Sequence, residues 1–140
     1  MIELMSHTEA ERRGVDPRVT QNISPYINPA HVLAPPREWL EALVNQSYSW
    51  HFFRLRYKNL LRARYQAEPE RFAALLRDSE GPRRLVLLCH CLTSHCHRAV
   101  AKEFLERLRE RTSDPAAAVP PAWAAQWRRL EAPLQRVVNG

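Results

Sequence analysis

The sequence predicts a small single-domain α/β protein with a short, mostly parallel sheet flanked by helices. Its 140 residues suit one domain that can bury a core without disulfides or metal. Two segments, residues 18–23 and residues 85–88, have the β-branched or apolar composition of strands. Around them, apolar residues recur at the spacing of amphipathic helices. Strands that alternate with helices favour a parallel sheet, because parallel strands need crossover connections.

The N-terminal 17 residues are polar, and we expect them to be loosely ordered. Within them, residues 8–13 predict a short helical turn that ends at Gly14. Residues 18–23 then predict the first strand. Four prolines between residues 25 and 36 forbid regular structure, so a long surface loop is expected there. The main domain is expected to span residues 18–111.

Three helices are predicted in the middle of the chain and one after the second strand. The first begins at Pro36, the second follows it, and the third begins at Pro69 and ends before Gly81. Helical spacing returns after the apolar run at 85–88. The stripes that define these helices are Trp39, Leu40, Leu43 and Val44; Trp50, Phe53, Tyr57, Leu60 and Leu61; Phe72, Leu75 and Leu76; and Val100, Phe104, Leu105 and Leu108.

Residues 112–140 predict a C-terminal linker and a helix that packs on the domain. An Ala- and Pro-rich stretch comes first, and apolar residues at helical spacing follow it. Pro133 predicts a kink in that helix.

Composition limits the classes of partner and compartment. The net charge of +6 favours anionic partners, such as nucleotides, phosphorylated metabolites or nucleic acid. The three cysteines lie within eight residues, which excludes a disulfide framework and fits a reducing, cytoplasmic compartment. A signal peptide and a membrane-spanning segment are not expected.

Chemistry is concentrated in residues 89–98, which hold all three cysteines, three of the six histidines and Arg98. This segment follows the buried strand predicted at 85–88 and leads into a helix. A loop after the carboxyl end of a strand is the usual ligand position in open α/β sheets.

The chain resembles the DUF488 family, a domain of unknown function. The resemblance covers roughly residues 18–110 and includes segments 33–40 and 50–57, but its most specific part is the strand that ends in Cys89 followed by Cys96-His97-Arg98. It implies a compact cytosolic α/β domain without an established activity. Related sequences often carry an acidic or another residue where this chain has Cys91, so a metal site built on Cys91 is not implied.

The first interpretation of residues 89–98 is a site for a phosphate-like or nucleotide-like anion. Thr93 or Ser94 at the helix N-cap would place residues 95–98 in the first turn, where free N–H groups favour an anion. Arg98 would add a bidentate donor, and Arg56 or Tyr57 could close the pocket. The alternative is that Arg98 pairs with a core carboxylate and the loop is only a tight connection.

The second interpretation is thiol chemistry. A helix N-terminus favours the thiolate, so Cys96 could be a nucleophile or redox sensor, with Cys91 or Cys89 as its resolving partner and His97 assisting. Buried, inert thiols are the alternative, and Cys89 is expected to be the most inert because it ends an apolar strand. Whether the chain is an enzyme is left open.

Two further interpretations remain. Cys89, Cys91, Cys96 and His97 could supply the sulfur and nitrogen ligands of a zinc ion, although their spacing differs from the common paired motifs. Separately, Arg54, Lys58 and Arg62 repeat at four-residue spacing and could track the phosphates of a nucleic acid. A solvated helix face is the simpler interpretation of that basic stripe.

Overall fold

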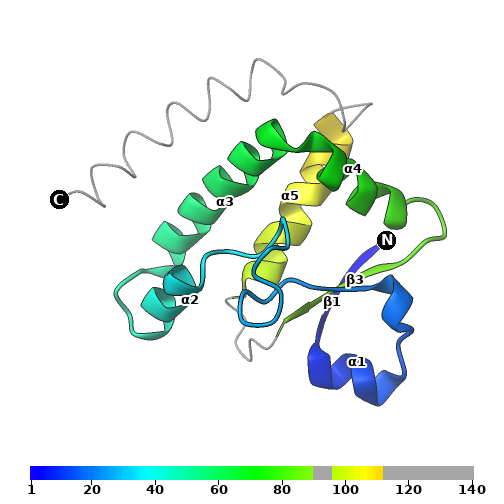
Figure 1. Ribbon diagram of the computed structural model, residues 1–140, viewed down its shortest axis with the longest axis horizontal. Coiled ribbons are helices and arrows are strands. Elements are labelled where there is room, and N and C mark those ends of the chain that lie inside the picture. The colour runs from blue at the N-terminus through cyan, green and yellow to red at the C-terminus, as the bar shows by residue number, and fades with distance from the viewer. Residues whose placement is uncertain (90–95, 112–140) are drawn as a thin grey trace.

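A computed structural model describes residues 1–89 and 96–111 of the chain (Figure 1). Three parallel strands form its sheet, in the order β1-β3-β2: β1 (Ile2–Ser6), β2 (Thr20–Asn22) and β3 (Leu85–Cys89). The central strand, β3, is buried at every position, as expected when helices cover both faces of a parallel sheet. The predicted α/β class and parallel sheet are confirmed.

Helices pack on the two faces of this sheet (Figure 1). The helices are α1 (His7–Arg13), a short 3-10 helix (Pro17–Val19), α2 (Arg37–Val44), α3 (Trp50–Ala67), α4 (Pro69–Asp78) and α5 (His97–Arg111). On one face, Leu85 and Leu87 of β3 join a large core with α3, α4 and α5. On the other face, Val86 and Leu88 pack with Ala10 of α1.

The expectation of a loosely ordered N-terminal segment is wrong. Residues 2–6 form β1 and pair with β3, from Ile2 opposite Leu85 to Ser6 opposite Cys89. The Ser6 hydroxyl then caps α1 by accepting the N–H of Glu9. The predicted end of this helix at Gly14 is confirmed by its left-handed conformation, with φ of 67°. Sequence reasoning missed β1 because an edge strand of five residues with polar positions lacks a continuous apolar run.

The predicted strand at 18–23 is only partly confirmed. Its first two residues belong to the 3-10 helix, because Pro17 starts that helix and Asp16 caps it by accepting the N–H of Arg18. Strand β2 is therefore reduced to Thr20–Asn22. The starts predicted for α2 and α4 agree with the structure to within one residue.

The segment from Ile23 to Pro36 is not a surface loop throughout, which corrects the expectation. Ile23 and Leu33 have no exposed surface. The Arg64 guanidinium of α3 donates to the carbonyls of Val32, at 2.8 Å, and Ala34, at 2.6 Å. The Tyr57 hydroxyl donates to the carbonyl of Leu33. Helix α3 thus fixes the loop that follows β2.

The C-terminal helix predicted within residues 112–140 lies outside the described residues. None of the helices in residues 1–89 and 96–111 combines the length and apolar composition that a membrane crossing needs.

Candidate functional site

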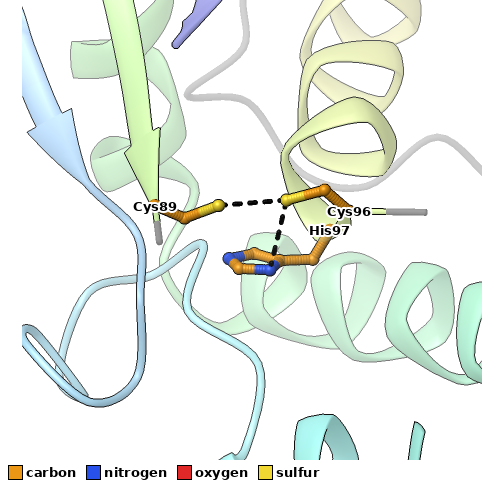
Figure 2. Close-up of side chains that lie close together, drawn as sticks. All are labelled: Cys89, Cys96 and His97. Carbon is orange, nitrogen blue, oxygen red and sulfur yellow. Dashed lines mark hydrogen bonds between the residues drawn. The ribbon is translucent and has the colours of Figure 1, made fainter. Parts of the chain in front are cut away.

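The carboxyl end of β3 and the start of α5 bring two cysteines and a histidine together (Figure 2). Cys89 is the last residue of β3, and alternation along the strand directs it to the same face as Leu85 and Leu87, which is the face that α5 covers. Cys96 immediately precedes α5, and His97 is its first residue. All three side chains are buried, with exposed fractions of 0%, 4% and 1%, respectively.

Three side chains surround the sulfur of Cys96. Its Sγ lies 3.0 Å from Sγ of Cys89, 3.1 Å from Nε of Arg98 and 3.9 Å from Nδ1 of His97. Figure 2 shows the Cys89 and His97 side chains pointing toward this sulfur. Because a guanidinium has only donors, the Arg98 contact requires the Cys96 sulfur to accept a hydrogen bond.

The position of the proton on His97 follows from its second nitrogen. Nε2 lies 2.9 Å from the carbonyl oxygen of Ile23, the residue after β2. A carbonyl only accepts, so Nε2 is protonated, and in the neutral ring Nδ1 is the basic nitrogen that faces Cys96. The His97 ring also makes an edge-to-face contact with the Tyr57 ring, with centroids 6.1 Å apart and an interplanar angle of 75°. This contact further fixes the orientation of the imidazole.

The arrangement contains groups that favour an ionised thiol. Guanidinium donors and helix N-termini favour a thiolate over a thiol, and the adjacent His97 nitrogen can accept the displaced proton. Cys89 can donate its S–H to the same sulfur, because either atom of the 3.0 Å pair can be the donor. An ionised Cys96 would be a nucleophile.

The structure brings together four of the side chains predicted for the site: Cys89, Cys96, His97 and Arg98. Their helix starts later than expected, because α5 begins at His97 and Cys96 lies just before it. The predicted residues Cys91, Thr93 and Ser94 lie outside the described residues.

The two predicted pocket-closing residues of α3 have different positions. Tyr57 is fully buried against His97, and burial raises the pKa of its phenol, so it stays neutral and supports the site from the interior. Arg56 lies over the Trp39 ring, 4.4 Å from its centroid, and donates to the Tyr48 hydroxyl at 2.6 Å. Its described contacts join α2 and α3.

Sequence reasoning missed the Ile23 carbonyl, which orients His97. A backbone carbonyl has no residue signature, so only the pairing of β2 with β3 reveals it. The apolar side chain of Ile23 belongs to the main core, so its burial is explained by packing alone and does not point to the role of its carbonyl.

The same residues form a three-donor set for a metal. Sγ of Cys89, Sγ of Cys96 and one ring nitrogen of His97 lie within 4.8 Å of one another. Zinc binds thiolate and imidazole at 2.0–2.3 Å in tetrahedral sites, and a ligand histidine commonly donates its other N–H to a carbonyl, as His97 does to Ile23. The donor types fit zinc, and Cys91, the fourth predicted ligand, lies outside the described residues.

The basic stripe of α3 is not a fully solvated face, which corrects the simpler interpretation. Arg54, Lys58 and Arg62 are all half-buried. Lys58 binds Glu103 of α5 at 3.3 Å, and Arg107 binds the same carboxylate at 2.9 Å. Burial lowers the pKa of Lys58 despite this ion pair. The stripe is thus partly used to join α3 and α5.

A family model matches residues 5–109, and its description is the active DUF488-N3 subclade. The match covers well over half of the chain and includes the end of β1, every element from α1 to β3, and most of α5. The chain belongs to the DUF488 family. No curated protein and no solved structure matches it. The family match confirms the resemblance drawn from the Cys89 and Cys96-His97-Arg98 pattern, and extends it toward the N-terminus.

Proposed function

We propose that this DUF488 protein is a cysteine-dependent enzyme in which the Cys96 thiolate attacks an anionic small molecule of the phosphate or nucleotide type. The proposal rests on one observation, the convergence of Arg98, Cys89 and His97 on the Cys96 sulfur at 3.0–3.9 Å. Zinc binding, treated below, is the second candidate.

Ionisation of Cys96 is the first step of this mechanism. An ordinary thiol has a pKa of about 8.5 and is mostly protonated at neutral pH. Here the Arg98 N–H supports the charged form, and Nδ1 of His97 can take the proton. The Ile23 carbonyl holds Nε2–H and so also stabilises the imidazolium that results.

The second step is nucleophilic displacement. The thiolate forms a bond to the electrophilic atom of the substrate, and the bond from that atom to its leaving group breaks. The leaving group departs with the electron pair of that bond and takes the proton from the His97 imidazolium. The product is a covalent Cys96 intermediate and a protonated leaving group, so charge and protons balance.

Two features support an anionic substrate. The chain carries a net charge of +6, and Arg98 places a guanidinium directly beside the nucleophile. The carboxyl end of a parallel strand followed by a helix is the usual ligand position of open α/β sheets. The description of the matching family as an active subclade agrees with an enzyme.

Protection of Cys96 from alkylation tests this proposal. Iodoacetamide is added at pH 7 with and without inorganic phosphate or adenosine monophosphate, and the label on Cys96 is followed by peptide mass spectrometry. We expect at least one anion to slow labelling several-fold in the wild type and not in Arg98→Ala. Arg107→Ala is the matched control, because Arg107 lies on the same helix and binds Glu103. Equal labelling rates with and without both anions would contradict the proposal.

Zinc is the second candidate because His97 already has the hydrogen-bond arrangement of a metal ligand, with Nε2 on the Ile23 carbonyl and Nδ1 3.9 Å from the Cys96 sulfur. Native mass spectrometry of protein purified without a metal affinity column, with a thiol titration on the same sample, separates the candidates. One zinc per chain with protected thiols would favour the metal site. Removal of that zinc with a chelator would then free the thiols and lower the melting temperature. No metal and one fast thiol would favour the nucleophile.

A further inference from the structure

The geometry points to Cys89 as a resolving thiol, which forms a reversible disulfide with Cys96 after a hydroperoxide oxidises that residue. The inference rests on the proposed reactivity of Cys96 and adds a regulation of the same site. Its basis is the 3.0 Å separation of the Cys89 and Cys96 sulfurs.

Cys89 is placed to react with Cys96. Its side chain has no exposed surface, so a large reagent in solution cannot reach it. It ends β3, opposite Ser6, while Cys96 lies just before α5. A disulfide requires an S–S distance of about 2.05 Å, so the sulfurs need to approach by roughly 1 Å. Both residues lie at the ends of regular elements, where small backbone shifts break few hydrogen bonds.

The chemistry has two balanced steps. The Cys96 thiolate attacks a hydroperoxide, and together with one proton this gives a Cys96 sulfenic acid and the corresponding alcohol, or water when the oxidant is hydrogen peroxide. The Cys89 thiol then attacks the sulfenic sulfur. The S–S bond forms, the S–OH bond breaks, and the hydroxide leaves as water with the Cys89 proton.

This disulfide would turn the site off reversibly. In the oxidised form the Cys96 sulfur has no thiolate, so it can neither attack a substrate nor accept the Arg98 hydrogen bond as an anion. The disulfide also prevents further oxidation of Cys96 to the irreversible sulfinic acid. A thiol reductant restores both thiols.

Cysteine variants and intact-mass measurement test the inference. The full chain is treated with a small excess of hydrogen peroxide at pH 7. We expect the wild type to lose about 2 Da, and dithiothreitol to reverse this loss. Cys91→Ser, the matched control, should also lose about 2 Da. Cys89→Ser should instead gain about 16 or 32 Da, on Cys96. Cys89→Ala, with circular dichroism of both variants, guards against an effect of the serine hydroxyl in the core.

The outcomes separate this inference from the proposed function. A loss of about 2 Da in Cys89→Ser, or a gain of about 32 Da on Cys96 of the wild type, would overturn Cys89 as the resolving thiol while leaving Cys96 reactive. No oxidation of Cys96 in any variant would instead contradict the reactive thiolate of the proposed function, and the regulation with it.

Discussion

The two ends of β3 each have an arginine beside them, but these arginines contact different partners. At the amino end, Arg84 donates to both carboxylate oxygens of Glu3 in β1, at 2.7 and 2.8 Å. At the carboxyl end, Arg98 donates to the sulfur of Cys96 at 3.1 Å. The first contact ties two strands together, whereas the second lies in a cluster of buried cysteine and histidine side chains.

The difference lies in the ionisation of the partner. A carboxylate is charged at neutral pH without help, and the Arg84 hydrogen bond only lowers the pKa of Glu3 further from its ordinary value. A thiol is mostly neutral at that pH, so a guanidinium beside it changes its protonation state and its reactivity. In our proposal, the same type of cation therefore supports structure at one end of the strand and chemistry at the other.

Among these substitutions, removal of the His97 side chain should have the largest effect on the free energy of unfolding. His97→Ala leaves a cavity in the core and the Ile23 carbonyl without the donor it has in the wild type. We expect the free energy of unfolding to fall by about 2–4 kcal/mol in urea titrations. His7→Ala, at a partly exposed histidine of α1 that binds Glu11, should change this free energy much less. Equal effects of the two substitutions would show that His97, at the carboxyl end of β3, stabilises the fold no more than a surface histidine does.

Acid should destabilise the folded protein through His31, in the loop that follows β2. Burial, with a smaller effect of Arg71 and Arg64, lowers the pKa of His31 to about 4. Between pH 6.5 and 4, His31 therefore binds a proton in the unfolded chain but stays neutral in the folded chain. The free energy of unfolding is then highest above pH 6.5 and decreases as the pH falls toward 4. We expect a loss of about 2 kcal/mol, allowing for partial solvent exposure.

The measurement is the free energy of unfolding at pH 7 and at pH 5 and 4.5. His31→Asn, which cannot titrate, should show a smaller decrease over this range than the wild type. Identical pH dependence of the two proteins would exclude His31 as the titrating group.

Substitution of the two arginines compares the two ends directly. Arg98→Ala should slow iodoacetamide labelling of Cys96 at pH 7 several-fold, because loss of the guanidinium leaves a smaller fraction of the thiol ionised. Arg84→Ala should leave the labelling rate unchanged, because Arg84 contacts Glu3 at the opposite end of β3. A similar decrease in both variants would mean that net charge, and not the contact with the sulfur, controls reactivity.

Loss of the Glu3–Arg84 ion pair should have the smallest effect. Both side chains are partly exposed, and exposed ion pairs contribute little to stability. Glu3→Gln should lower the melting temperature only slightly and leave Cys96 labelling unchanged. A large decrease in melting temperature would show that this pair is essential to the β1–β3 pairing.

The sequence predicts the site better where its residues are contiguous than where the fold brings them together. Cys96, His97 and Arg98 are adjacent in the chain, so the helix start alone groups them. Cys89 was expected to be inert because it ends an apolar strand, and its burial is confirmed. Only its position on the α5 face of β3 reveals the contact with Cys96.

The fold shows the same contrast. The long amphipathic helix α3 and the continuous apolar strand β3 have strong periodic signals, and both are confirmed. Strand β1 has no such signal, since only Ile2 and Met5 are buried in it and its pairing is with a strand about 80 residues away. Long-range pairing of this kind is set by the tertiary packing and not by the local sequence.

The most direct test of a reactive thiolate is a titration of Cys96 alone, in the Cys89→Ala, Cys91→Ser double variant, by thiolate absorbance in the ultraviolet between pH 4 and 10. We predict that the thiolate is already formed at pH 7 and that the further change Arg98→Ala shifts its formation to higher pH. If the thiolate forms only above pH 8.5 or so, as in an ordinary cysteine, and Arg98→Ala has no effect, the activation of Cys96 by its neighbours is contradicted.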